Sequence, residues 1–256
     1  MTYISHSLES LSIVVPAHNE EQNIDALVAE IRATCLDLFQ GNKLRYEVII
    51  VDDGSTDGTG AIADSLAVLT EVKVVHHPVN RGYGAALRSG FEAATKRYVA
   101  FIDGDRQLDP RDFLRLAPHA RRTQLSIGYR KRRDDPWYRR LLGKMFSRVF
   151  VPLTIGVRVR DVDCALKIIP GELIRSADLS SDGALINSEL LAMAVADGYT
   201  IHEEAVGHFP RVWGEQSGAN FRVIARVFWE LYRVRRRVRQ HVLSRPNSTP
   251  VAARSI

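Results

Sequence analysis

Short apolar runs alternate with amphipathic segments along the amino-terminal part of the chain. The apolar runs 11–15, 47–51, 72–75 and 98–102 each end in polar residues, and apolar residues at helical spacing follow, as over 20–39. Strands that alternate with helices form a parallel sheet with helices packed on its faces. The pattern therefore predicts an α/β fold with a doubly wound, mostly parallel sheet and flanking helices.

The rest of the chain is less regular. Its periodicity predicts strands over 126–129, 161–169 (antiparallel) and 200–206, and helices over 188–197 and 221–244. The tail over 245–256 contains Pro and Ser, and we expect it to be disordered. The predicted organisation is one large domain over 1–220 followed by a basic amphipathic helix and this tail.

Composition narrows the class of protein. The chain has 256 residues, 45% of them hydrophobic, which is enough for one α/β domain with a proper core. Cys35 and Cys164 have no metal-ligand spacing, so we expect reduced thiols in a cytosolic protein. We find no signal peptide and no apolar run of the ~18–20 residues that span a bilayer. Basic residues crowd 121–148 and 222–245, which indicates an anionic partner, either nucleic acid or a lipid surface.

The strand over 98–102 ends in Asp103-Gly104-Asp105, two carboxylates separated by one residue. In open α/β sheets this end of a strand is where ligands bind. Two ionised carboxylates lie close together only when a cation compensates them, and oxygen ligands favour Mg²⁺ or Mn²⁺ shared with substrate phosphates. The motif therefore predicts a metal that holds a diphosphate. The alternative is an acidic loop before the next helix, since Asp109-Pro110 is typical of a helix start.

Polar residues also follow the first two strands, and strand ends in a parallel sheet meet at one edge. A nucleotide can lie across that edge, with Asp52 or Asp53 accepting hydrogen bonds from a base or ribose. Gly82 permits close approach of backbone, and Arg81 can pair with phosphate. Alternatively, 52–55 is a turn with an Asx cap. The chain lacks the glycine patterns of ordinary dinucleotide-binding and P-loop proteins.

Taken together, four segments resemble family 2 glycosyltransferases in order and spacing. They are 14–21, 51–59, 80–85 and 103–107. The similarity is strongest to the polyprenol-phosphate (dolichol-phosphate) mannosyl- and glucosyltransferases, and it covers about residues 10–215. It implies a GT-A fold, a nucleotide-sugar donor and inversion at the anomeric carbon, with 1–220 as the catalytic domain.

The resemblance also implies roles for individual residues. The donor would contact Pro16, Ala17, Asn19, Glu20, Asp52, Asp53, Arg81, Gly82, Asp103 and Gly104. Asp103, Asp105 and Gln107 would hold the metal, and the catalytic set would be Asp103, Asp105 and Arg211, with Arg211 clamping phosphate from the loop 208–217. For His208 we expect a structural hydrogen bond.

The acceptor decides what further chemistry is needed. The departing nucleoside diphosphate needs a cation and an arginine. A lipid phosphate is already an anion, so it needs only positioning, and we expect Arg130 and Arg133, with Ser147, to contact it. A sugar hydroxyl needs a general base instead. The candidate bases are Asp161, Asp163 and Glu189, which can equally be structural.

Two segments mix large apolar residues with arginines, 137–150 and 221–238. Such a helix suits a membrane interface, where clustered arginines attract anionic lipid. The alternative is a solvated helix face packed on its own core, and nucleic acid is disfavoured because no motif for it is present. We expect an interfacial helix over 137–150 and a peripheral protein at the cytoplasmic face of the membrane, or dependence on a separate transmembrane partner subunit.

The leading hypothesis is an inverting enzyme that transfers a hexose from a GDP-mannose or UDP-glucose type donor to polyprenyl phosphate. A second hypothesis keeps the enzyme class but places the acceptor hydroxyl on a glycan of a cell-envelope polysaccharide or glycolipid. The third, from another class, is a nucleotide- or membrane-binding protein without catalysis. The intact Asp103 and Asp105 pair argues against this third hypothesis.

Overall fold

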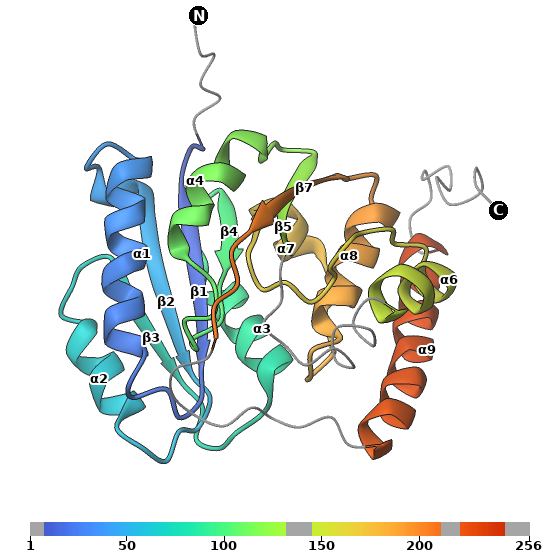
Figure 1. Cartoon of the computed structure of the whole chain (residues 1–256), viewed down its shortest axis with the longest axis horizontal. Helices are drawn as coiled ribbons and strands as arrows, with labels where there is room; N and C mark the ends of the chain where they lie inside the picture. The colour runs from blue at the N-terminus through green and yellow to red at the C-terminus, as the bar shows by residue number, and fades with distance from the viewer. Residues whose placement is uncertain (1–7, 132–144, 211–220, 244–256) are drawn as a thin grey trace, which may run out of the picture.

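A computed structural model describes residues 8–131, 145–210 and 221–243, with side chains described throughout except over 221–230. Its centre is a seven-stranded sheet in the order β3-β2-β1-β4-β6-β5-β7, flanked by helices (Figure 1). The strands are β1 Leu11–Ala17, β2 Tyr46–Asp52, β3 Val72–His76, β4 Tyr98–Phe101, β5 Gln124–Arg130, β6 Lys167–Pro170 and β7 Thr200–Val206. The prediction of an α/β fold with a large central sheet is confirmed.

The strand directions also follow the prediction. β1 pairs in parallel with β2 and β4, and β2 with β3. β6 is antiparallel to its neighbours β4 and β5, whereas β7 runs parallel to β5. Every residue of β1 and β2 is buried, as expected for strands covered on both faces. The carboxyl ends of β1, β2 and β4 therefore meet at one edge of the sheet.

The helices that flank the sheet are longest near both ends of the described chain. They are α1 Ile24–Leu38, α2 Thr59–Leu66, α3 Tyr83–Ala93, α4 Phe113–Leu116, α6 Val151–Ile155, α7 Gly171–Ser176, α8 Ile186–Ala196 and α9 Phe221–Leu243. Short turns of other helix types are η1 Lys43–Arg45, η2 Pro110–Asp112, η3 Ala117–His119 and the π-helical η4 Phe146–Phe150. None of the helices in the described ranges is both long and apolar enough to cross a bilayer.

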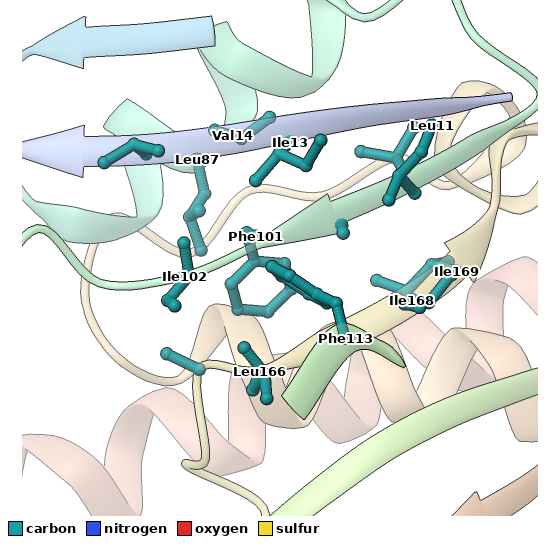
Figure 2. Packing of buried hydrophobic residues seen from close by; sticks show 14 of the residues in the cluster. Leu11, Ile13, Val14, Leu87, Phe101, Ile102, Phe113, Leu166, Ile168 and Ile169 are labelled. Carbon is teal, nitrogen blue, oxygen red and sulfur yellow. The ribbon is translucent and has the colours of Figure 1, made fainter. Parts of the chain in front are cut away.

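The core lies on both faces of the central strands (Figure 2). On β4, Phe101 meets Phe91 of α3 edge to face, with ring centroids 5.8 Å apart. Phe113 of α4 is 1% exposed and lies close to the Phe101 ring in the same view. Burial of such rings supplies much of the stabilising apolar area. Both free cysteines, Cys35 and Cys164, are buried.

Element boundaries differ from the prediction where side chains hold the chain in turns. The helix expected from Glu20 begins at Ile24, because Glu20 and Asn23 are bonded into a turn. The strand expected over 161–169 is confined to Lys167–Pro170, because 161–166 curl around the buried ammonium of Lys167. The strand predicted over 200–206 is confirmed, and the helix predicted to start at 221 ends at 243.

Several predictions fall on residues outside the described ranges. These are Arg133, Arg211, most of the interfacial helix expected over 137–150, and the tail expected to be disordered over 245–256. The described end of the 137–150 segment is helical, and this helical stretch continues through α6 to Gly156, which has a left-handed φ of 76°.

Candidate active site

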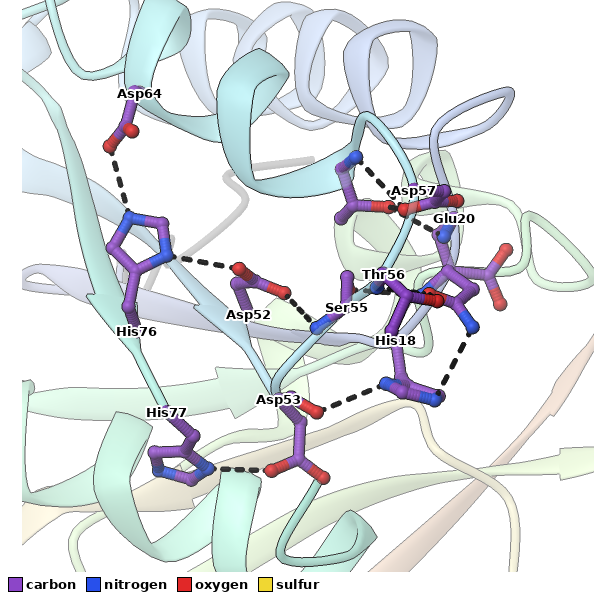
Figure 3. Close-up of polar contacts among 12 residues, drawn as sticks. His18, Glu20, Asp52, Asp53, Ser55, Thr56, Asp57, Asp64, His76 and His77 are labelled. Atoms are coloured by element: carbon purple, nitrogen blue, oxygen red, sulfur yellow. Dashed lines mark hydrogen bonds and ion pairs between the residues drawn. The ribbon is translucent and has the colours of Figure 1, made fainter. Parts of the chain in front are cut away.

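The loops after β1 and β2 are joined into one unit by hydrogen bonds (Figure 3). Asn19 takes a left-handed φ of 57°, its backbone N–H donates to Ser55 Oγ at 3.0 Å, and its Oδ1 accepts from Thr56 N at 2.8 Å. The Glu20 N–H donates to Thr59 Oγ1 at 2.8 Å. A left-handed asparagine is tolerated because its amide bonds locally. The predicted base-pocket residues Asn19 and Glu20 are thus held beside the Asp52–Asp53 turn.

Asp53 is buried, and both of its carboxylate oxygens are used inside the protein. Oδ1 accepts from Arg81 N at 2.9 Å and contacts His77 Nδ1 at 2.6 Å, while Oδ2 accepts from Gly82 N at 2.8 Å. Gly82 has a φ of 94°, and a Cβ there would lie 2.7 Å from the carbonyl oxygen of Asp182. Only glycine therefore fits this turn. Asp53 fixes the loop that presents Arg81, whose side chain is exposed.

Asp52 is likewise saturated (Figure 3). Its Oδ1 accepts from Ser55 N at 3.0 Å, which is the Asx-capped turn that the sequence allowed, and its Oδ2 lies 3.0 Å from His76 Nδ1. His76 Nε2 continues to Asp64 at 3.0 Å. Burial acts to raise the pKa of Asp52, but hydrogen bonds from Ser55 and His76 hold it below its usual value. Asp52 is therefore an ionised group with internal partners.

Asp103 behaves differently. Its Oδ1 is buried and has no hydrogen-bond partner within the described part of the chain. Burial, and then the charge of Asp105, raise the pKa of Asp103 to about 7. The Tyr83 hydroxyl and the positive charges of Arg130 and Lys167 oppose this rise. A buried oxygen without a partner indicates a missing ligand atom.

Gly104 and Gln107 tie this acidic turn to its surroundings. A Cβ on Gly104 would lie 2.9 Å from the carbonyl oxygen of Pro16, so the ends of β4 and β1 meet in close contact. Gln107 Nε2 donates to Phe209 O at 3.2 Å, and Phe209 N donates to Gln107 O at 2.9 Å. The Asp105 carboxylate accepts from Gln107 N at 3.1 Å. Gln107 thus also anchors the segment that precedes Arg211, a role that sequence reasoning missed.

The sequence analysis also assigned no role to Lys167. It lies in β6 and is fully buried, and its ammonium donates to Asn187 Oδ1 at 2.9 Å and to the carbonyl oxygens of Val162 and Cys164. Burial lowers its pKa, and the charges of Cys164, Asp163, Asp161 and Asp103 act in the opposite direction. A lysine is almost never fully buried without partners. Its position within the apolar run Ala-Leu-Lys-Ile-Ile is the sequence signal that could have identified Lys167 as a buried, hydrogen-bonded residue.

The acceptor-side residues are mostly engaged with one another. Arg130 forms a bidentate ion pair with Asp161, in which Nε donates to Oδ2 at 2.7 Å and Nη2 donates to Oδ1 at 2.9 Å. Burial acts to lower the pKa of Arg130, but the Asp161 hydrogen bonds and charge raise it. Ser147 Oγ accepts from Val162 N at 3.3 Å and is buried. Arg130 and Ser147 thus contact two adjacent residues, Asp161 and Val162.

Of the three candidate bases, Glu189 and Asp161 have structural partners. Glu189 is fully buried and accepts hydrogen bonds from Ser180 N at 3.0 Å and Ser181 N at 2.8 Å. Asp163 is partly exposed, and its charge acts on Tyr83, Arg130 and Lys167, three groups that also act on Asp103. Among the three candidate bases, Asp163 therefore has the strongest electrostatic link to the turn that contains Asp103 and Asp105.

The chain matches the family model described as "Glycosyl transferase family 2" over residues 12–179. The chain belongs to glycosyltransferase family 2. This span contains the β1 and β2 loops, the Gly82 turn, the Asp103–Asp105 motif and Lys167, so the geometry above is that of a family 2 glycosyltransferase. The expected family and enzyme class are confirmed.

Curated relatives carry polyprenyl-phosphate names. The undecaprenyl-phosphate 4-deoxy-4-formamido-L-arabinose transferase of Aeromonas hydrophila is 34% identical over 211 residues, which covers 81% of this chain and 62% of that protein. The dodecaprenyl-phosphate galacturonate synthase of Rhizobium johnstonii is 33% identical, with 85% and 65% covered. The polyprenol monophosphomannose synthase of Mycolicibacterium smegmatis is 28% identical, with 82% of each chain covered. The chain therefore spans somewhat under two thirds of the first two relatives.

Solved structures show the same fold. The glucosyl-3-phosphoglycerate synthase of Mycobacterium tuberculosis, in complex with Mn²⁺, UDP and glucosyl-3-phosphoglycerate, matches with a TM-score of 0.57 at 21% identity, covering 94% of this chain and 82% of that one. S. aureus TarS in complex with UDP-GlcNAc matches with a TM-score of 0.59 at 19% identity, covering 93% and 68%. The expected GT-A fold is confirmed.

Proposed function

We propose that this enzyme transfers a hexose with inversion from a nucleoside-diphosphate sugar, of the GDP-mannose or UDP-glucose type, to polyprenyl phosphate at a membrane surface. The observation that carries the proposal is the Asp103–Asp105 turn, where a buried oxygen of Asp103 has no hydrogen-bond partner among the described residues and the pKa of Asp103 is raised to about 7. The names of the curated relatives support the lipid-phosphate acceptor.

The residues at this turn fit a divalent metal. Asp103, Asp105 and the side-chain oxygen of Gln107 offer only oxygen ligands, which favours Mg²⁺ or Mn²⁺. A cation would compensate the two carboxylates, since burial and then the charge of Asp105 raise the pKa of Asp103. When bound, the metal supplies positive charge for the departing diphosphate.

The donor is proposed to lie across the joined loops after β1 and β2. Pro16, Ala17, Asn19 and Glu20 would line the base. Asp52 and Asp53 would shape the nucleoside side of the pocket mainly through the loops that they hold. The exposed Arg81 and, from outside the described ranges, Arg211 would pair with phosphate, because guanidinium groups match phosphate geometry.

The acceptor is proposed to approach from the side of η4 and α6. Exposed Arg148, Arg158 and Arg160, with Pro152, Val159 and Glu203, line a depression of about 420 Å³ on this side. Met145, Val149 and Leu153 recur every four residues along the adjoining helical segment and are 41%, 44% and 74% exposed. An apolar stripe beside arginines suits a membrane surface. It supports the peripheral contact, alone or with a transmembrane partner subunit.

With a phosphate acceptor, no protein base is required, because the attacking oxygen is already ionised. Arg130 would contribute to phosphate binding as part of its pair with Asp161, with Ser147 at the neighbouring Val162 and with Arg133, which lies outside the described ranges. The second candidate, a glycan hydroxyl, would need a general base. Asp163 is the residue that supports it, because it is partly exposed and its charge acts on groups that also act on Asp103.

We also propose that 1–220 forms the catalytic unit and that α9 packs onto it. Leu231 and Val234 are buried, whereas Arg233, Arg235 and Arg236 are exposed. This part of α9 therefore combines a face packed on the protein with a basic outer face, which can meet anionic lipid.

Incubation of the enzyme with polyprenyl phosphate in bilayers, Mn²⁺ and a panel of labelled nucleotide sugars tests the proposal. We expect labelled sugar in the chloroform-soluble phase with one donor, and none with Asp105→Asn. Asp37→Asn, an exposed carboxylate near the end of α1, is the charge-matched control and should retain activity. Transfer to a water-soluble glycan and not to lipid would contradict the proposed acceptor.

A further inference from the structure

A second group of metal-ligating side chains lies between η3 and the edge strand β7, outside the donor site. His202 and Glu204 are two residues apart on β7, so they share one face of the strand, and His119 ends η3. One ligand atom from each of the three side chains lies within 4.8 Å of the others. We propose that His119, His202 and Glu204 form a second metal site that takes Zn²⁺.

The donor atoms set the class of metal. Two imidazole nitrogens and one carboxylate oxygen are a zinc ligand set that leaves a fourth position for water. The Asp103–Asp105 turn offers oxygen alone and favours harder cations. The two sites therefore differ in chemistry, and Mg²⁺ should compete poorly with Zn²⁺ at the site that contains the two histidines.

The carboxylate of Glu204 is already oriented for binding. Its Oε1 accepts from Arg115 at 2.7 Å, while its Oε2 lies 3.6 Å from His202 Nε2. Arg115 also contacts Asp112 Oδ1 at 3.2 Å, so its charge is shared between two carboxylates. An outer partner of this kind fixes a ligating carboxylate and leaves its second oxygen for the metal.

His202 Nε2 supplies an independent sign of a missing atom. It is buried and makes no hydrogen bond to any described residue, although Glu204 Oε2 faces it. Buried polar atoms normally have a partner. A metal between the nitrogen and the carboxylate oxygen would satisfy both.

Binding would require one adjustment. The His119 and His202 rings are stacked, with centroids 3.8 Å apart and planes at 16°. A metal ligated by imidazole lies near the plane of each ring, so the rings must tilt apart toward a shared ion. Both rings are partly exposed, His202 on the edge strand β7 and His119 at the end of η3, so such a movement meets little packing resistance.

The site would join two parts of the fold. Asp112, Arg115 and His119 recur along one side of the 110–119 segment and contact Gly207, Glu204 and His202 of the β7 region. β7 leads into the segment that Gln107 holds through Phe209. Zinc coordination would add a further connection between the 110–119 segment and β7 and would raise the stability of the native state.

Titration of the whole chain with ZnCl₂, without nucleotide and with Mg²⁺ in excess, tests the proposal by calorimetry. We expect one zinc-binding event, with affinity lowered in His119→Gln and His202→Gln by at least the ~10–100-fold that loss of an outer partner costs. His241→Gln is the matched control, because His241 of α9 pairs with Asp197 just after α8, away from the proposed site. This variant should bind zinc with wild-type affinity. Asp103→Asn with Asp105→Asn should also keep it.

Thermal unfolding separates ligation from simple packing. If the histidines only stack, His119→Gln and His202→Gln lower the melting temperature equally with and without zinc. If they ligate, the rise in melting temperature caused by zinc disappears in these variants and persists in His241→Gln. Equal zinc affinity in all variants, or no zinc binding by the wild type, would overturn the proposal.

Discussion

Two aspartate pairs stand at strand ends of the same sheet, and they differ in what surrounds them. Asp52 and Asp53 follow β2 and receive hydrogen bonds or ion pairs from Ser55, His76, His77, Arg81 and Gly82. Asp103 and Asp105 follow β4, and Asp103 has a buried oxygen with no described partner. Both members of the first pair have partners within the protein, whereas the second pair is the one that we propose to bind a cation.

The difference shows that a carboxylate motif does not by itself identify a ligand site. A buried carboxylate is stabilised by donors, and its pKa falls when those donors come from the protein. The pKa of Asp52 is lowered in this way, whereas that of Asp103 is raised to about 7. Direction of the pKa shift therefore separates an aspartate that builds a loop from one that is available to a metal.

The largest effect is expected from Asp105→Asn, which removes one of the two charges at the proposed metal turn. Sugar transfer should fall by at least ~100-fold, because stabilisation of the departing diphosphate is lost. The fold should remain, since Asn at position 105 can still accept the hydrogen bond from Gln107 N. Single-turnover transfer measures the first effect and circular dichroism the second. A wild-type transfer rate in this variant would contradict the proposed difference between the two aspartate pairs.

Asp53→Ala should instead act mainly on stability. It removes the acceptor for the Arg81 and Gly82 N–H groups and for His77, and each unsatisfied buried donor costs about 1–3 kcal/mol. We expect the free energy of unfolding to fall by roughly 2–4 kcal/mol in urea denaturation. Asp53→Asn keeps part of the acceptor capacity and should lose less. A stable Asp53→Ala protein that cannot bind donor would assign Asp53 directly to the ligand.

The pH dependence of stability should also distinguish the pairs. Because the pKa of Asp103 is raised from its usual 3.8 to about 7, the metal-free protein should lose stability as pH rises from about 4 to 7. Asp103→Asn should remove this loss. The lowered pKa of Asp52 has the opposite sign, and its contribution disappears as pH falls below its usual value. Melting temperatures in EDTA across pH 3–8 measure both, and an unchanged profile in Asp103→Asn would contradict the assignment.

The smallest effect is expected from His76→Gln. His76 links Asp52 to Asp64, but its side chain is 41% exposed, and exposed ion pairs contribute about 0–1 kcal/mol. Mn²⁺ binding should be unaffected, because the pair on β2 is separate from the metal turn. A large loss of Mn²⁺ affinity in this variant would show that the two aspartate pairs are coupled.

The sequence predicted the amino-terminal half of the fold well because its strands are buried on both faces and alternate with amphipathic helices. The resemblance of its motifs to family 2 glycosyltransferases predicted the family, which is confirmed. Prediction failed where a single side chain reorganised the backbone, as Lys167 does for 161–166. It also treated Gln107 only as a metal ligand, whereas its amide also holds Phe209. Such contacts join residues far apart in the chain, and local patterns carry no record of them.

The sequence alone determined the α/β architecture and the family, because periodicity and motif order are local properties of the chain. Only the tertiary structure decided which carboxylates have internal partners. It paired Asp161 with Arg130 and Glu189 with the 180–181 turn, and among the described residues it left the buried oxygen of Asp103 without a hydrogen-bond partner. Hydrogen-bond satisfaction depends on donors supplied by distant segments, so folding, and not the motif, separates a structural aspartate from one that can bind a metal.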